Sequence, residues 1–290
     1  MTSDSSTPPF ATASLVLRAS PLSALEARVL LGHALGWRRT ELITRGDEPI
    51  GDAALARYRA LEARRMAGEP IAQIVGAREF YGLTFDVTPD VLIPRPETEL
   101  LVDTVLEAIA PIPHARVLDL GTGSGAIGIA IASARPDARV WAVDRSPQAL
   151  AVAARNAAKL LDPARPGGPV SCLQGDWYVG LAPALAGSFD MIVSNPPYIA
   201  VGDPHLDEGD LRFEPRGALT DEADGLSAIR TIVASADAFL CAQGQIWIEH
   251  GYNQAAAVRA LLSAAGFTNV RSLPDLAGID RATGGSRRSR

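Results

Sequence analysis

The 290-residue sequence has little lysine and no excess of positive charge. Lysine occurs once, at Lys159, so almost every cation is an arginine, and the formal net charge is −6. Proteins that bind nucleic acid mainly by neutralising phosphates carry a basic surplus, which this sequence lacks. We therefore expect no direct nucleic-acid partner, although net charge alone leaves room for a local basic patch.

Cysteine and long apolar runs are also scarce. The two cysteines, Cys172 and Cys241, form no CxxC pair and no cluster with histidine, so we expect free thiols in a reducing compartment and no metal site. No apolar run reaches the ~18 residues of a membrane helix. Met1 to Pro9 lacks the positive start of a signal peptide, which predicts a disordered lead-in. These absences predict a cytoplasmic protein without membrane association, and we expect a monomer.

The chain is long enough for one large domain and a smaller one. Apolar spacing over the first ~70 residues predicts short amphipathic helices, one of which places Leu22, Leu25, Val29 and His33 on a single face. β-Branched and aromatic residues around Gly82 then predict a hairpin. We expect a helical domain over residues 1–74, a hairpin linker over 75–92 and the main domain over 93–290.

The main domain alternates short apolar runs with helical stretches. This alternation is typical of βαβ units, so it predicts the α/β class with a mostly parallel, Rossmann-like sheet. The predicted strands are Arg116–Leu120, Arg139–Asp144, Val170–Gln174, Phe189–Ser194 and Gln245–Glu249, and the clearest helices are Ile127–Ala134 and Pro147–Leu161.

A glycine-rich turn follows the first of these strands, with the sequence Gly121-Thr122-Gly123-Ser124-Gly125. Glycines let the backbone bend sharply and approach a ligand closely, and ligands of such sheets bind beyond the carboxyl ends of the strands. The next strand ends in Asp144, which is placed to accept hydrogen bonds from ribose hydroxyls. A nicotinamide cofactor stays open at this point, because the glycines up to Gly128 also satisfy the dinucleotide fingerprint.

A second motif, Asn195-Pro196-Pro197-Tyr198, follows the fourth strand. The two prolines stiffen the loop and remove two N–H donors, so its polar groups are mostly acceptors. The side-chain oxygen of Asn195 and the carbonyl of Pro196 suit the two hydrogens of a planar –NH2 group, and Tyr198 offers an aromatic face to it. Such a loop orients a weakly nucleophilic nitrogen towards a methyl donor, which hydride transfer does not require. The motif predicts a methyltransferase with Asn195, Pro196 and Tyr198 as catalytic residues.

With these motifs the chain resembles the HemK/PrmC family of release factor glutamine methyltransferases from Ser20 to Asp280. The most specific matching segments are Leu92-Ile93-Pro94-Arg95-Pro96-Glu97-Thr98-Glu99, Gly175-Asp176-Trp177, Arg212-Phe213-Glu214-Pro215 and Glu249-His250-Gly251. The resemblance implies a small helical N-terminal domain that docks the substrate, a β-hairpin and a seven-stranded class I methyltransferase domain. It also implies S-adenosyl-L-methionine as cofactor, S-adenosyl-L-homocysteine as product, and the glutamine of the Gly-Gly-Gln loop in class I peptide chain release factors as substrate.

The resemblance also assigns roles to individual residues. Gly121 to Gly125 and Asp144 are expected to hold the cofactor, together with Asn195, and Trp177 to pack beside the adenine. Asn195, Pro196, Pro197 and Tyr198 are expected to bind the glutamine amide. Arg95, Pro96 and Glu97 are expected to line the approach to the site. His205 and His250 show no carboxylate–histidine spacing that would support a catalytic base.

One segment departs from the family pattern. After Asp280 the chain reads Arg281-Ala282-Thr283-Gly284-Gly285 and continues into a basic tail, which predicts a short or frayed last strand.

Three alternatives remain open at this level. A nucleic-acid methyltransferase acting on adenine or guanine amines would use the same loop, but it would also need to flip its base and grip phosphates. A glutamine methyltransferase of a ribosomal protein would share the chemistry. A non-catalytic binding module would keep the fold and fail to bind S-adenosylmethionine.

Overall fold

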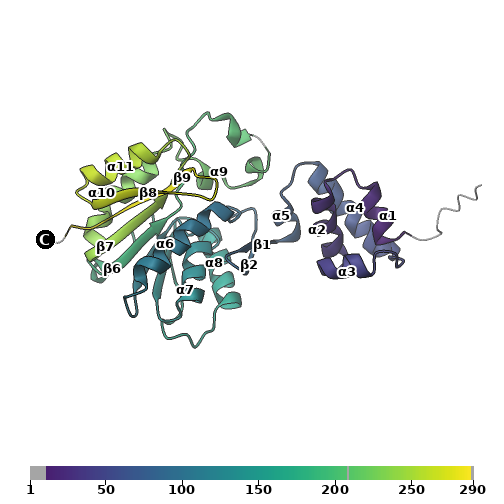
Figure 1. Cartoon of the computed structure of the whole chain (residues 1–290), viewed down its shortest axis with the longest axis horizontal. Helices are drawn as coiled ribbons and strands as arrows, with labels where there is room; N and C mark the ends of the chain where they lie inside the picture. Colours follow the sequence, from purple (N-terminus) through teal and green to yellow (C-terminus); the bar gives the residue numbers. More distant parts are fainter. Residues whose placement is uncertain (1–10, 208, 289–290) are drawn as a thin grey trace, which may run out of the picture. The chain divides into compact units, whose positions relative to one another are not determined.

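A computed structural model describes residues 11–207 and 209–288, and the predicted lead-in over Met1 to Pro9 lies outside these ranges. The chain divides into two compact units between Gly76 and Ala77 (Figure 1). No helix in the described ranges combines the length and the apolar character that crossing a bilayer requires. Both cysteines are free.

The first unit is helical and has its own apolar core. Its helices are α1 (Ala13–Ala19), α2 (Ala24–Leu35), α3 (Arg39–Thr44), α4 (Asp52–Met66) and α5 (Ile71–Val75). Leu30 and Leu31 of α2 and Tyr58 of α4 are fully buried in this core. The face predicted for α2 is wrong, because Leu25 and Val29 are 69% and 40% exposed. Helix α2 has apolar residues at helical spacing on two faces. The face that packs into the core contains Ala27, Leu30, Leu31 and Ala34.

The second unit contains the hairpin β1 (Ala77–Phe80) and β2 (Leu83–Asp86) and a seven-stranded sheet in the order β5-β4-β3-β6-β7-β9-β8. The sheet strands are β3 (Arg116–Leu120), β4 (Arg139–Asp144), β5 (Ser171–Gln174), β6 (Phe189–Ser194), β7 (Leu240–Glu249), β8 (Thr268–Pro274) and β9 (Asp280–Ser286). The helices are α6 (Glu99–Ile109), α7 (Ala126–Ala134), α8 (Pro147–Leu160), α9 (Arg216–Leu219), α10 (Ser227–Phe239) and α11 (Ala255–Ala264). Short 3-10 turns are η1 (Pro96–Thr98), η2 (Pro183–Leu185), η3 (Pro204–Asp207) and η4 (Leu211–Phe213).

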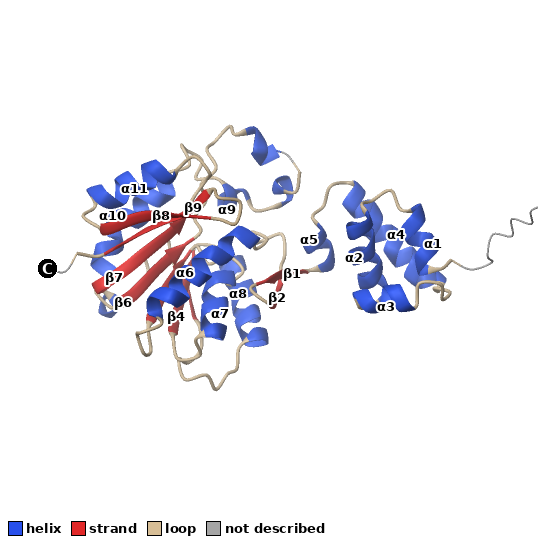
Figure 2. Ribbon diagram, in the orientation of Figure 1, coloured by secondary structure: helices blue, strands red, loops and turns tan. Residues whose placement is uncertain are grey.

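Helices cover both faces of this sheet (Figure 2). Alternate residues of a strand point to opposite faces, so each central strand supplies two cores. Val117 of β3 packs in the cluster that includes α6 and α7, whereas its neighbour Leu118 packs with α10 and α11. Trp247 and Ile246 of β7 divide in the same way. Burial on both faces explains why the strands are continuous apolar runs, and it confirms the predicted α/β class.

The expectation of a short or frayed last strand is wrong. Strand β9 has seven residues and pairs antiparallel with both β7 and β8, so it lies inside the sheet. Its glycines are there for packing: a Cβ on Gly284 would overlap the ring of Trp247. The departure from the family pattern that suggested fraying instead leaves room for a tryptophan on the neighbouring strand.

The sheet changes winding direction at β3. This strand lies between β4, which follows it along the chain, and β6, which comes after β5. The crevice beyond the carboxyl ends of the strands at such a switch point is the usual ligand site of an open α/β sheet. Both motifs of the sequence lie at this edge.

Candidate active site

A cavity of about 220 Å³ opens at the carboxyl ends of β3, β4, β5 and β6. Of the residues predicted for the site, it is lined by Gly121, Thr122, Gly123, Ser124, Asp144, Trp177, Asn195 and Pro197. Gly125, Pro196 and Tyr198 do not line it. Further lining residues come from the segment before α6, including Arg95 and Thr98, and from the region of α9, including Gly217.

The glycine turn after β3 forms one wall of this cavity. Gly121 has φ +70°, and a Cβ there would lie 3.4 Å from the ring of Trp177. The positive φ favours glycine here, whereas a Cβ would only make an ordinary contact with the indole. The Gly121 and Thr122 amides donate to the Val143 carbonyl of β4 at 2.8 and 3.0 Å, which fixes the turn against the neighbouring strand.

Asp144 ends β4 beside this turn. Its Oδ2 accepts from the Gly123 amide at 2.9 Å, and its Oδ1 accepts from the Ser146 amide at the same distance. A carboxylate offers about four lone-pair sites, so each oxygen keeps acceptor capacity for a ligand hydroxyl. The carboxylate is thus held in place before any ligand arrives.

Asp119 supports the glycine turn from behind, a role that the motif analysis missed. It is fully buried in β3, and its Oδ2 accepts from the Thr122 hydroxyl at 2.6 Å and from the Gly128 amide at 3.1 Å. Its Oδ1 is buried without a hydrogen-bond partner in the described part of the chain, and burial raises the pKa of Asp119 to about 6. An acidic residue inside an otherwise apolar strand was the available signal.

The loop after β6 brings Asn195 and Pro197 to the cavity wall. The Nδ2 of Asn195 donates to the Thr98 hydroxyl at 3.1 Å. Tyr198 is largely buried behind this wall, with its hydroxyl 3.4 Å from Oε1 of Glu249, and burial raises the pKa of Tyr198. The loop therefore offers Asn195 to a ligand and directs the Tyr198 hydroxyl towards the end of β7.

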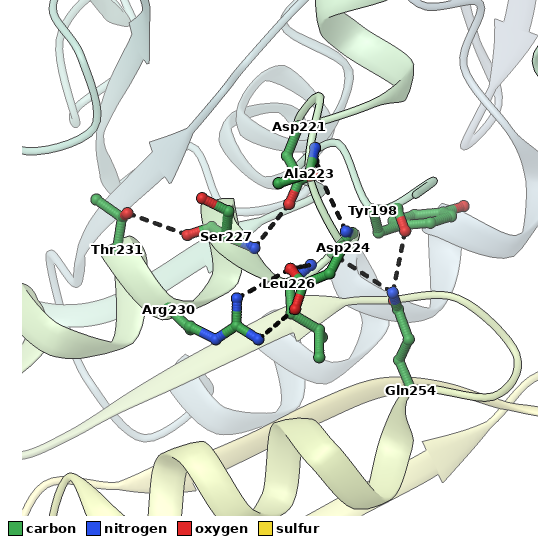
Figure 3. A network of polar contacts seen from close by, with 10 residues as sticks. Tyr198, Asp221, Ala223, Asp224, Leu226, Ser227, Arg230, Thr231 and Gln254 are labelled. Carbon is green, nitrogen blue, oxygen red and sulfur yellow. Dashed lines mark hydrogen bonds and ion pairs between the residues drawn. The ribbon is translucent and has the colours of Figure 1, made fainter. Parts of the chain in front are cut away.

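A polar network holds this loop from behind (Figure 3). Nε2 of Gln254 donates to the carbonyls of Tyr198 and Gly225 at 3.0 and 3.2 Å, and its Oε1 accepts from the Gly251 amide at 2.8 Å. Asp221 accepts from three backbone amides of its own loop, including that of Gly225. A side chain on Gly225 would overlap the Tyr198 carbonyl, so two loops pack here backbone to backbone.

Both units of the chain match known family models. Residues 10–76 match the PrmC N-terminal domain, and residues 96–207 match the methyltransferase small domain. A release factor glutamine methyltransferase of Burkholderia pseudomallei is 70% identical over 95% of this chain and 96% of its own length. The chain belongs to the release factor glutamine methyltransferase family.

A second relative agrees with this assignment, and a solved structure shares the fold. The release factor glutamine methyltransferase of Bordetella pertussis is 54% identical over 91% of this chain and 95% of its own length. Among solved structures, the hMettl16 catalytic domain aligns with a TM-score of 0.56 over 81% of each chain. Its sequence identity is 16%, so that likeness concerns the fold alone.

Two segments that carry the family resemblance meet at the cavity. Arg95, which lines it, forms an ion pair with Glu214, whose side chain is fully buried. Glu214 also accepts from the Ile93 amide at 2.9 Å, and its burial raises its pKa while Arg95 opposes this shift. Glu214 stands in a segment that carries the resemblance, but sequence reasoning assigned it no role, since nothing in the chain order links it to Arg95.

His250 is held as a neutral structural residue. It is fully buried, its Nδ1 lies 3.0 Å from the Gly251 carbonyl and its Nε2 lies 2.7 Å from the Thr283 hydroxyl. The carbonyl accepts only, so Nδ1 carries the proton and Nε2 accepts from Thr283. Burial lowers the pKa of His250 accordingly. Of His205 the structure describes the backbone alone.

Proposed function

We propose that this protein transfers the methyl group of S-adenosyl-L-methionine to the side-chain amide nitrogen of the glutamine in the Gly-Gly-Gln motif of class I release factors. One observation carries the proposal: Asn195 stands on the wall of the same cavity as the glycine turn and Asp144. A planar amide and a nucleotide-type methyl donor can therefore share one site.

The residues of the cavity fit such a cofactor. Asp144 keeps acceptor capacity for ribose hydroxyls, and Trp177 offers an indole at the cavity wall for the adenine. Gly121, Gly123 and Gly125 all have positive φ, so the turn brings backbone rather than side chains to the ligand. The unpaired Oδ1 of Asp119 lies behind the turn as a buried acceptor outside the cavity lining, which a water would satisfy.

When bound, the cofactor supplies an electrophilic methyl group attached to a positively charged sulfur. The protein's task is to hold the amide nitrogen in line with that carbon, at about 3–3.5 Å in a reactive arrangement. The Asn195 side-chain oxygen, on the cavity wall, and the carbonyl of Pro196, which does not itself line the cavity, are the proposed acceptors for the two N–H groups. They also stabilise the positive charge that develops on nitrogen as the N–C bond forms and the C–S bond breaks.

Proton loss follows methyl transfer in this scheme. The amide lone pair is delocalised, so its N–H is not acidic before attack, and no strong base is needed then. Once alkylated, the nitrogen is cationic and releases a proton readily to a neighbouring acceptor or to water. The neutral, buried His250 is therefore not required as a base.

The test is a methyl-transfer assay with radiolabelled S-adenosylmethionine. Parallel reactions contain unmethylated release factor, the same factor with its loop glutamine changed to alanine, a ribosomal protein fraction, and total RNA and DNA. We expect label on the unaltered factor alone. Label on nucleic acid would favour the exocyclic-amine alternative, label on a ribosomal protein the other glutamine methyltransferase, and absence of cofactor binding the non-catalytic module.

A further inference from the structure

Asn156 of helix α8 joins two parts of the chain that lie far from it in the sequence. It is fully buried and does not line the cavity. Its Oδ1 accepts from the Asp86 amide at 2.8 Å, and its Nδ2 donates to the carbonyls of Asp86 and Ser124 at 3.0 and 2.9 Å. One side chain of α8 thus connects the end of β2 to the glycine turn after β3.

The chemistry of these partners determines the orientation of the Asn156 amide. A backbone amide only donates and a carbonyl only accepts, so Oδ1 must face the Asp86 amide and Nδ2 must face the two carbonyls. Both hydrogens of the Nδ2 group are used, one on each carbonyl. Towards Asp86 the side chain bonds both backbone groups of one residue, as a neighbouring strand would. An aspartate or a leucine of similar size could not make all three bonds.

The Ser124 carbonyl needs a donor from outside the neighbouring helix. Gly125 has φ +83° and is the N-cap of α7, so Ser124 lies before the helix. The amide of Gly128, four residues further along, donates to Asp119. Removing the Asn156 side chain would take the donor from a buried carbonyl, which costs free energy. Asn156 therefore stabilises the turn in the conformation that it has at the cavity wall.

A second part of the cavity wall depends on the same side chain. Residues 90–92 follow the end of β2 and line the cavity, as Ser124 does. We propose that Asn156 is a positioning residue that holds the glycine turn and the segment after β2 in one arrangement around the cofactor. The inference rests on the proposed function, since it concerns S-adenosylmethionine in that cavity. Without the Asn156 amide the two parts of the wall can move independently, so the cofactor binds a less preorganised site.

Calorimetric titration with S-adenosylmethionine compares Asn156→Ala with the unaltered enzyme. We expect the Kd to rise about 10- to 100-fold, because a buried carbonyl at the cavity wall loses its donor. Asn156→Asp keeps an acceptor for the Asp86 amide and loses the Nδ2 group, so its Kd should rise as well. It replaces Asn156→Ala in the test if the alanine variant does not fold. An unchanged Kd in a folded variant would overturn the proposal.

Two controls separate this role from a general effect on stability. Lys159→Met removes the ion pair between α8 and the Asp86 carboxylate without changing a contact of the turn. Val258→Ala removes buried apolar atoms of α11, outside the cavity lining. We expect both variants to bind the cofactor with unchanged Kd, although Val258→Ala should lower the melting temperature. A Kd that rises in either control as much as in Asn156→Ala would overturn the proposal.

Amide hydrogen exchange provides a readout that does not depend on catalysis. In the cofactor-free protein, the amides of Gly121 to Gly125 should exchange faster in Asn156→Ala than in the unaltered protein or in Val258→Ala. At saturation, S-adenosylmethionine should slow exchange of the Asp86 amide in the unaltered enzyme but not in Asn156→Ala, because coupling through Asn156 is reciprocal.

Equal exchange at the turn in all three proteins would overturn the proposal. If the unaltered enzyme does not bind S-adenosylmethionine, the proposed function fails. The exchange rates of the cofactor-free proteins still decide the role of Asn156 in that case.

Discussion

Glu249 is the residue whose ionisation matters most for the site. Burial raises its pKa to about 7; the Thr98 and Tyr198 hydroxyls and Arg281 of β9 oppose this shift, and Glu97 of η1 adds to it. An ionised Glu249 can only accept from the Tyr198 hydroxyl, 3.4 Å from its Oε1, whereas a protonated Glu249 can also donate to it. The hydrogen bonding of the predicted catalytic residue Tyr198 is thus linked to a carboxylate that does not line the cavity.

The pH profile follows from this linkage. We expect kcat to fall as the pH decreases through about 7, because Glu249 then takes up its proton. In Glu249→Gln this limb should be absent, with a low kcat at every pH. Steady-state kinetics in buffers of constant ionic strength measure both profiles. An identical acid limb in the two enzymes would show that another group controls it.

The raised pKa of Glu249 also makes the stability of the folded protein depend on pH. The pKa of Glu249 is higher in the folded state than its usual value of 4.5, so the folded state binds more protons between 4.5 and about 7. The contribution of Glu249 to stability is therefore lost as the pH rises through that window. Thermal denaturation should show Glu249→Gln gaining stability relative to the unaltered protein from about pH 5 to about pH 8. If the difference in melting temperature between the two proteins does not change with pH, the pKa of Glu249 is not raised in the folded state.

Gly225 offers a test of the backbone contact behind Asn195. Gly225 and Gly187 both have positive φ, so an alanine at either costs about 1 kcal/mol in backbone strain. Only at Gly225 would the new Cβ meet another group, the Tyr198 carbonyl, whereas the space around Gly187 is open. We expect Gly225→Ala to lower kcat at least about tenfold by displacing the loop, and Gly187→Ala to leave it unchanged. If Gly225→Ala and Gly187→Ala have the same kcat, the loop accommodates the added methyl group without moving Asn195.

At the scale of elements, helix α2 presents an apolar face to solvent. Leu25 and Val29 lie one turn apart on it, opposite the buried Leu30 and Leu31. We propose that the helical unit docks the protein substrate, as the family resemblance implies, and that this face takes part. The double substitution Leu25→Glu and Val29→Glu should raise KM for release factor about tenfold or more, with cofactor Kd unchanged. Ile43→Glu on α3, also exposed, is the control, and equal effects of the two changes would refute a specific role for α2.

Strand β9 shows where tertiary packing overrides local pattern. Gly284→Ala should lower the melting temperature, by a loss of about 1–3 kcal/mol, because its Cβ would overlap the ring of Trp247. Gly285→Ala meets its neighbours at 3.1 Å and should cost less. Thermal unfolding of the two variants gives the comparison. If both are equally stable, the glycines are not required for packing in β9.

The elements that the sequence predicted well are those whose signal is local. Strands β3, β4 and β6 have the predicted bounds, because apolar runs buried on two faces are continuous and end at glycine, aspartate or proline motifs. Strand β9 and the buried face of α2 were mispredicted, because their neighbours lie far away in the chain. Local pattern did not reveal which of two apolar faces packs, or that a glycine makes room for a tryptophan.

In the site, too, the sequence revealed the residues with a local signal but not the contacts between distant residues. The turn from Gly121 and the residues Asp144 and Asn195 stand in recognisable motifs, and the structure brings them to one cavity. The partners that fix them do not stand in those motifs: Thr98 is 97 residues from Asn195, and Glu214 is 119 residues from Arg95. Both stand in segments that carry the family resemblance, but their roles depend on hydrogen bonds that form only in the folded chain, so the sequence assigned them none.

At the scale of the whole molecule, the chain combines a helical unit with a sheet whose switch point holds the cavity. Family membership and the cavity's composition agree on methyl transfer, and the central claim is the acceptor atom. The most direct measurement is tandem mass spectrometry of release factor after incubation with the enzyme and S-adenosylmethionine. We expect a single methyl group on the side-chain nitrogen of the Gly-Gly-Gln glutamine, and none with Asn195→Ala enzyme. A methyl group on any other residue, or an unmodified factor beside methylated RNA or DNA, would contradict the account.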